Sequence, residues 1–173
     1  MLSSILAKSD CAACKFCCSF RRTSLWETPV IPAADLPKLK EIYPEAKFRK
    51  TGKESYTFDL TGAYKTTDPE EEAPCPFLDP YSGCKLSNEL KPFECKIWPL
   101  RAVRLADAPE TAGSDQGLAI ALTPTCPAIN KVPEEKVRQL AASGLGKAII
   151  DYAESHPDII KDETDFLSNI IYK

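Results

Sequence analysis

Four cysteines within eight residues near the start of the chain constrain its fold more than any other feature. The run Cys11-Ala-Ala-Cys14-Lys-Phe-Cys17-Cys18 repeats the C-x-x-C spacing, at which two thiolates can face one metal ion from a single turn of backbone. Four more cysteines follow at Cys75, Cys84, Cys95 and Cys126. Because the chain contains a single histidine, His156, a metal site here would consist almost entirely of sulfur. Thiolates favour zinc, copper(I) or iron–sulfur clusters over magnesium or calcium.

The rest of the composition is that of an ordinary globular protein. A chain of 173 residues, 43% apolar and 27% charged, can bury a core of its own. Its formal net charge of −3 argues against a nucleic-acid partner, since general nucleic-acid binding usually needs a basic face. Ionised thiols would make the chain more negative still, so a bound cation would be electrostatically favourable.

No segment predicts export or insertion into a membrane. No stretch approaches the roughly 18 to 20 apolar residues of a transmembrane helix, and the apolar part of residues 1–8 is too short for a secretory signal. We therefore expect a cytoplasmic protein with no membrane partner. In a reducing compartment, eight cysteines are more often metal ligands than disulfides.

Hydrophobic patterning predicts a small α+β protein. The expected elements are a helix over residues 33–43, a strand over 55–60, a β-hairpin formed by 97–105 and 117–123, a helix over 133–153 and a last short helix over 163–172. The segment 74–100 contains five prolines and a glycine, so turns should dominate it and a metal would supply the missing order. The acidic run at 70–72 is expected to lie in a solvated loop.

We thus expect a small irregular domain that bound metal stabilises, with a β-hairpin or small antiparallel sheet and C-terminal helices. Residues 1–130 would form the cysteine-cluster metal-binding domain. Residues 131–173 would form a C-terminal helical element packed on the same domain.

The isolated cysteines occur in settings that suit metal ligation. Proline directly follows Cys75 and Cys126, and the same Cys-Pro step ends the ligand run of bacterial ferredoxins. Cys84 follows Gly83, and Cys95 follows a turn that begins at Pro92. At such bends, backbone amides can point at sulfur and orient the ligand.

Taken in order, these motifs resemble the YkgJ-type cysteine-cluster family. They are C-x-x-C-x-x-C-C, then Cys75-Pro-Phe-Leu-Asp79, Gly83-Cys84-Lys-Leu, and Lys91-Pro-x-x-Cys95-x-x-Trp-Pro99. The resemblance runs from about Cys11 to Cys126 and implies a zinc- or iron-chelating domain. It places Cys11, Cys14, Cys17, Cys18, Cys75, Cys84 and Cys95 at the family's cysteine positions, with Cys126 as its late cysteine. The chain departs from the usual pattern at Ala13, Lys91 and Trp98, none of which is a candidate ligand.

Eight candidate ligands suit more than one metal. They could form two four-cysteine zinc sites, one [4Fe–4S] cluster with four thiols to spare, or two clusters. No second C-x-x-C knuckle follows Cys18, and the separations between Cys75, Cys84 and Cys95 are too wide for one. We therefore favour an iron–sulfur cluster, most simply [4Fe–4S], with Zn²⁺ as the alternative.

The leading prediction is a metal-binding protein that ligates an iron–sulfur cluster in redox, electron-transfer or metal-handling work, with an unidentified protein or redox partner. One alternative is a zinc-binding structural or interaction module. A second alternative is a protein lysine methyltransferase whose catalysis a cluster supports, because a flagellin lysine methylase is related to the family that the chain resembles.

The glycine pair Gly144-Leu-Gly146 does not support a nucleotide-binding enzyme. It lacks the third glycine of G-x-G-x-x-G, since position 149 is Ile149, and no strand precedes it. This pair is expected to mark a helix kink or boundary.

Overall fold

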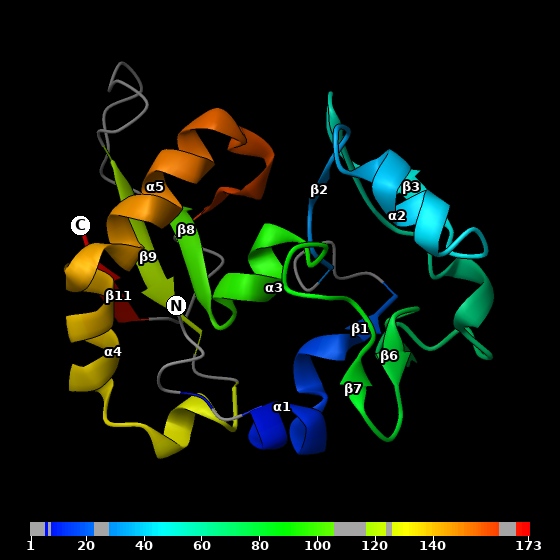
Figure 1. Cartoon of the computed structure of the whole chain (residues 1–173), viewed down its shortest axis with the longest axis horizontal. Helices are drawn as coiled ribbons and strands as arrows, with labels where there is room; N and C mark the ends of the chain where they lie inside the picture. The colour runs from blue at the N-terminus through cyan, green and yellow to red at the C-terminus, as the bar shows by residue number, and fades with distance from the viewer. Residues whose placement is uncertain (1–5, 7, 23–27, 106–116, 124–125, 163–168) are drawn as a thin grey trace. The chain divides into compact units, whose positions relative to one another are not determined.

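The computed structural model describes the chain except residues 1–5, 7, 23–27, 106–116, 124–125 and 163–168, and the side chains of Lys8, Cys11 and Asn169 also lie outside the description (Figure 1). The chain divides into two compact units. The cysteine unit is Cys11–Lys96, and the C-terminal unit combines Met1–Asp10 with Ile97–Lys173. Both contain helices and strands, so the predicted α+β class is confirmed.

The C-terminal unit is built on a four-stranded sheet. Its strands, in the spatial order β10-β8-β9-β11, are β10 (Lys161–Asp162), β8 (Leu100–Arg104), β9 (Leu118–Leu122) and β11 (Asn169–Tyr172). The predicted hairpin is confirmed, because β8 and β9 pair antiparallel from Leu100 opposite Leu122 to Arg104 opposite Leu118. Strand β9 is wholly apolar and mostly buried, as expected for a strand covered by helices, whereas β8 also contains the buried Arg101 and the exposed Arg104.

The helix predicted over residues 133–153 is present, with a break near its middle. It comprises α4 (Glu134–Leu140), a π-helical turn (Ala141–Leu145) and α5 (Gly146–Ser155). The break falls at Gly144, whose φ of 114° is accessible mainly to glycine, so the expectation of a kink is confirmed. Helix α5 packs on β8 and β9, and its Ile149 and Ala153 are fully buried (Figure 1). A Cβ at Gly146 would lie 2.6 Å from the Tyr172 ring, so the helix and β11 meet without space for a side chain.

The helix predicted over residues 163–172 is wrong where the structure describes that segment. Residues 163–168 lie outside the description, and Asn169–Tyr172 forms β11, antiparallel to β9. Adjacent isoleucines satisfy a helical or an extended pattern equally well, and here the exposed edge of β9 offers backbone partners. Two further 3₁₀ turns, Ile129–Lys131 and Pro157–Ile159, flank the helices.

The division into units falls after Lys96, whereas the sequence placed the start of a C-terminal element at residue 131. Strands β8 and β9 group with the later helices because α5 packs directly on them. No helix in the described part of the chain has the length and apolar character needed to cross a membrane.

The cysteine unit consists of short elements. They are α1 (Lys8–Cys14, which begins before the unit), the 3₁₀ turns η2 (Phe16–Cys18) and η3 (Thr61–Ala63), α2 (Leu36–Ile42), α3 (Phe93–Ile97), and the strands β1 (Ser19–Arg21), β2 (Ile31–Pro32), β3 (Phe48–Lys50), β4 (Ser55–Phe58), β5 (Glu72–Pro74), β6 (Leu78–Asp79) and β7 (Gly83–Cys84). The strands pair as β2-β4-β3, β1-β5 and β6-β7. The predicted helix over 33–43 and strand over 55–60 are confirmed in shorter form.

An aromatic core anchors the cysteine segments of this unit. Phe20, Phe58 and Phe77 are fully buried, and the Phe58 and Phe77 rings meet edge to face at 5.4 Å between centroids. The Tyr43 ring contacts Phe77 in the same way at 4.8 Å. Phe20 lies two residues after Cys18 and Phe77 two residues after Cys75, so both segments are fixed by residues that the core holds.

Candidate metal centre

The N-terminal cysteine run changes direction in its middle. Helix α1 ends at Cys14, and Lys15 then adopts a left-handed conformation, with φ 54° and ψ 4°. The turn η2 follows directly and carries Cys17 and Cys18, and the Cys18 amide donates to the Lys15 carbonyl at 2.9 Å. The first C-x-x-C, from Cys11 to Cys14, therefore lies within α1, and the second, from Cys14 to Cys17, spans the helix end and the chain reversal at Lys15. A non-glycine residue in this conformation costs about 1–2 kcal/mol, which the surrounding contacts must offset.

One such contact involves the Lys15 side chain, whose Nζ donates to the carbonyl of Pro80 in the β6–β7 hairpin. This ties the reversal to a segment 65 residues later in the chain. Cys11 belongs to α1, and its side chain lies outside the description.

A backbone hydrogen bond brings the second cysteine segment against the first. Strands β1 and β5 pair antiparallel, with Ser19 opposite Pro74, and the Cys75 amide donates to the Cys18 carbonyl at 2.7 Å. This bond extends the ladder by one step. Cys18, directly before β1, therefore lies beside Cys75, directly after β5. The Cys75 carbonyl then accepts from the Leu78 amide at 2.9 Å and turns the chain towards β6.

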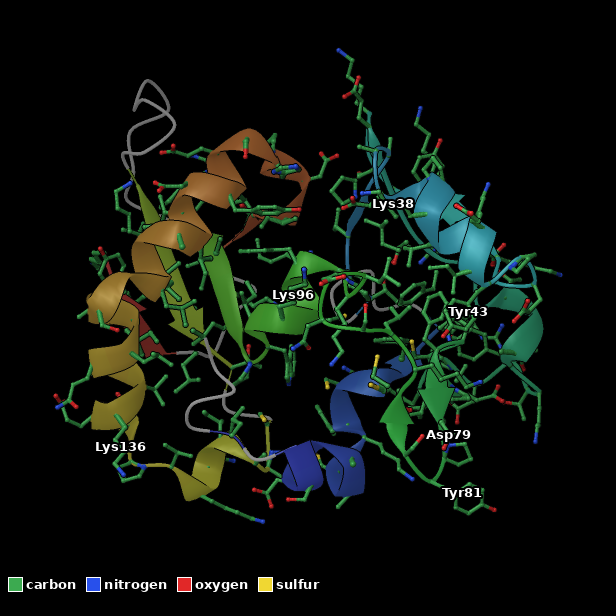
Figure 2. All side chains as sticks on the ribbon, viewed as in Figure 1. Lys38, Tyr43, Asp79, Tyr81, Lys96 and Lys136 are labelled. Carbon is green, nitrogen blue, oxygen red and sulfur yellow. The ribbon has the colours of Figure 1, made fainter. Side chains whose placement is uncertain are left out.

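The β6–β7 hairpin adds the third segment. Leu78 pairs with Cys84, and the Lys85 amide donates to the Phe77 carbonyl at 2.8 Å. The hairpin also lies close to the N-terminal run, since a Cβ at Gly83 would be 3.5 Å from the Cβ of Ala12 in α1. Figure 2 shows yellow sulfur atoms gathered between α1 and this hairpin.

The hairpin loop is shaped by its own carboxylate. Asp79 accepts hydrogen bonds from the amides of Ser82 at 2.7 Å and Tyr81 at 2.9 Å, and these bonds lower the pKa of Asp79. The Tyr81 side chain projects from the loop and is 93% exposed (Figure 2).

The pKa of the Cys75 thiol reflects its burial and the proximity of cysteines from two other segments. Burial, with smaller contributions from the neighbouring Cys84 and Cys17, raises the pKa of the Cys75 thiol to about 12, although a hydrogen bond from the Phe77 amide opposes the shift. Thiols influence one another's ionisation only when their charges interact at close range. Without a cation, Cys75 therefore stays protonated at neutral pH. A bound metal would supply the positive charge that this group of thiolates needs.

The donor chemistry fits a thiolate-bound metal, but the side chains are not arranged around one. Among the described residues, no three or more His, Cys, Asp or Glu side chains together form a group that could hold a metal ion. The seven cysteines with described side chains are present as thiols. Cys17 and Cys84 are exposed, whereas Cys14, Cys18 and Cys75 are partly buried. Metal binding would thus require side-chain rotation, which exposed thiols can make at low cost.

The other two predicted ligands occupy different surroundings. Cys95 is exposed in α3 of the cysteine unit, and its amide donates to the Pro92 carbonyl at 3.0 Å. Cys126 is buried and belongs to the C-terminal unit. His156 ends α5, and its ring stacks on Tyr152 with 4.0 Å between centroids, in the same unit as Cys126.

The acidic run at 70–72 is more ordered than a solvated loop. Glu71 accepts three hydrogen bonds from Lys65 and Thr66 and forms an ion pair with Arg22, whereas Glu70 is 70% exposed in its ion pair with Arg21. The sequence pattern predicted no such network, although the opposite charges of Arg21-Arg22 and of the acidic run could have indicated it.

No protein-family model, curated protein or solved structure matches this chain. The likeness to the YkgJ-type family therefore rests on the order and spacing of the cysteine motifs themselves.

Proposed function

We propose that the cysteine unit binds an iron–sulfur cluster through thiolates and serves in redox, electron-transfer or metal-handling work. The observation that carries the proposal is the convergence of three cysteine segments. The N-terminal run, the turn after β5 and strand β7 are joined by the Cys18–Cys75 hydrogen bond, the Leu78–Cys84 pair and the approach of Gly83 to α1. The approach of cysteine segments that are distant in the sequence supports a thiolate-bound metal at this place.

Cys75 forms the proposed centre of the ligand set together with Cys17 and Cys84, which both lie close enough to affect its ionisation. The fourth thiolate of a [4Fe–4S] cluster would come from the N-terminal run, where Cys11, Cys14 and Cys18 are the candidates. Cys95 and Cys126, which belong to different units, each remain a candidate ligand or a spare thiol.

The surroundings of this centre suit electron transfer. Cys75 is partly buried beside the aromatic core, whereas Cys17 and Cys84 are exposed. When bound, a cluster supplies one-electron redox chemistry, and its potential depends on solvent exposure and on hydrogen bonds to sulfur. The Phe77 amide, which hydrogen-bonds to the Cys75 sulfur, would contribute such a bond. The exposed thiols would leave one side of the centre open to a redox partner.

Anaerobic purification, with visible absorption and quantified iron, acid-labile sulfide and zinc, tests the proposal. We expect a coloured protein with about four iron and four sulfide per chain. A colourless protein with stoichiometric zinc would support a thiolate site and refute the cluster, and a protein without metal would refute both. Cys84→Ser should lose the metal, whereas Ser87→Ala, at an exposed position three residues later, should retain it.

A further inference from the structure

The ladder of β1 and β5 connects the cysteines to a polar network. Its three pairs run from Ser19 opposite Pro74 to Arg21 opposite Glu72. The bond between the Cys75 amide and the Cys18 carbonyl lies at one end of the ladder. At the other end, Arg22 directly follows β1 and Glu71 directly precedes β5. Because an isolated two-stranded ladder is only marginally stable in water, the register that places Cys18 beside Cys75 needs support from side chains.

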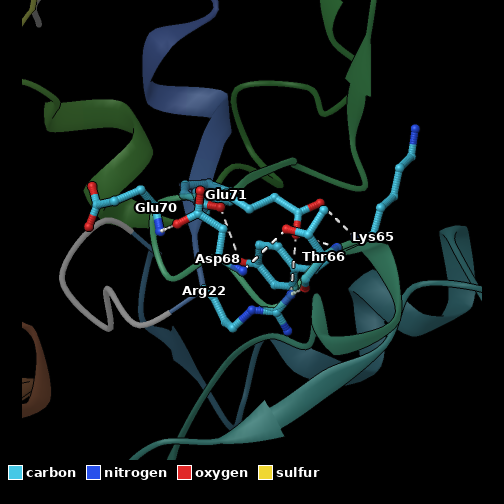
Figure 3. A network of polar contacts seen from close by, with 8 residues as sticks. Arg22, Lys65, Thr66, Asp68, Glu70 and Glu71 are labelled. Atoms are coloured by element: carbon cyan, nitrogen blue, oxygen red, sulfur yellow. Dashed lines mark hydrogen bonds and ion pairs between the residues drawn. The ribbon is translucent and has the colours of Figure 1, made fainter.

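Glu71 supplies that support on the β5 side. Its carboxylate accepts hydrogen bonds from the Lys65 amide at 2.6 Å, the Thr66 amide at 2.8 Å and the Thr66 hydroxyl at 2.8 Å (Figure 3). It also accepts from an Arg22 guanidinium nitrogen at 3.3 Å. These donors, the Lys65 amide foremost, lower the pKa of Glu71 to about 2, so the carboxylate stays ionised throughout the physiological range.

Arg22 supplies the support on the β1 side. Its guanidinium donates to the Thr66 carbonyl as well as to Glu71, and it lies over the Tyr64 ring at 4.4 Å from the ring centroid. The Tyr64 hydroxyl in turn donates to the carbonyl of Phe20 in β1 at 3.1 Å. The segment from Tyr64 to Thr66 thus contacts β1 and the residue after it, Arg22. It also contacts Glu71, the residue before β5.

We propose that this Arg22–Glu71 network, made of Arg22, Tyr64, Lys65, Thr66 and Glu71, is a positioning element that fixes β1 against β5 and so holds Cys17 and Cys18 beside Cys75 for metal capture. The inference rests on the proposed function in so far as it concerns metal. Its structural part, that the network sets the register beside Cys75, stands independently and is measurable in the metal-free protein.

The test compares two neighbouring glutamates in the full-length protein. Glu70 also pairs with an arginine of β1, Arg21 at 3.0 Å, but its side chain is 70% exposed and it serves as the matched control. Reduced protein is loaded with Co²⁺, and release to excess chelator is followed by the thiolate-to-cobalt charge-transfer absorption. We expect Glu71→Gln to release Co²⁺ about tenfold faster than the native protein or more, with an altered charge-transfer spectrum, and Glu70→Gln to release it at the native rate.

Two further measurements separate positioning from general destabilisation. Thr57→Val removes a buried hydroxyl that donates to the Pro29 carbonyl at 2.8 Å, and neither residue belongs to the ladder or to the Arg22–Glu71 network. It should lower the free energy of unfolding and leave the cobalt spectrum unchanged. Hydrogen exchange of the Cys75 amide in metal-free protein should accelerate in Glu71→Gln and not in Glu70→Gln.

The outcomes distinguish this inference from the proposed function. Native protein that binds no Co²⁺ would refute the thiolate site, and amide exchange at Cys75 would still decide whether the network sets the register. Equal Co²⁺ release and equal Cys75 exchange in the two glutamine variants would overturn the positioning role. A Thr57→Val variant that releases Co²⁺ as fast as Glu71→Gln would overturn it as well.

Discussion

The raised pKa of the Cys75 thiol makes a quantitative prediction for the metal-free protein. The unfolded thiol ionises near 9.0, whereas burial and the neighbouring Cys84 and Cys17 hold the folded pKa at about 12. Between these values the unfolded state loses a proton that the folded state keeps, so raising the pH stabilises the unfolded state. The contribution of Cys75 is therefore intact below pH 9 and falls by about 1.4 kcal/mol per pH unit above it, to a total of about 4 kcal/mol.

Urea denaturation from pH 8 to pH 11 in native protein and in Cys75→Ala measures this effect. Other groups titrate in both proteins and cancel in the difference between their free energies of unfolding. We expect that difference to shrink as the pH rises, because only the native protein has the buried thiol. Parallel pH profiles would refute the argument that Cys75 is held protonated. In the metal-bound protein, the free energy of unfolding should instead fall as the pH is lowered, because the ligands must be thiolates and acidification releases the metal.

Two local features give further predictions. Gly146→Ala should lower the free energy of unfolding by about 1–3 kcal/mol, because the new Cβ would lie 2.6 Å from the Tyr172 ring. Thermal unfolding measures this loss. An equal loss in Gly62→Ala, where the new Cβ would have no contact within 4 Å, would contradict the explanation. Lys15→Val should cost about 1–2 kcal/mol and weaken Co²⁺ binding, since a β-branched residue at φ 54° is strained. Lys15→Asn should be tolerated at that position, and similar losses in both variants would point to the contact with Pro80 instead.

Local signals in the sequence predicted most of the elements. Pro44 and the apolar spacing before it indicated α2, and the two apolar runs on either side of a polar loop indicated the β8–β9 hairpin. Gly144 indicated the break in the long helix, where its φ of 114° is observed. Each of these depends on residues close together in the chain.

Features that depend on distant pairing were not accessible in the same way. Strand β11 forms on the edge of β9, which lies more than forty residues earlier, and adjacent Ile170 and Ile171 gave no preference for it over a helix. Spacing marked the cysteines as ligands, but only the register of β1 on β5 shows that Cys18 lies beside Cys75. The role of Glu71 depends on amides that no side-chain pattern reveals.

The division of the chain into units also has a consequence for folding. The cysteine unit is inserted within the C-terminal unit, so its residues form a closed loop between Asp10 and Ile97. When this loop is unfolded, joining its ends costs chain entropy that grows with the logarithm of its length, on the order of a few kcal/mol. A metal that orders the cysteine unit would shorten the flexible chain between Asp10 and Ile97 and so lower this entropy cost. Metal loading should therefore raise the melting temperature of the C-terminal sheet, although none of its four strands contains a cysteine.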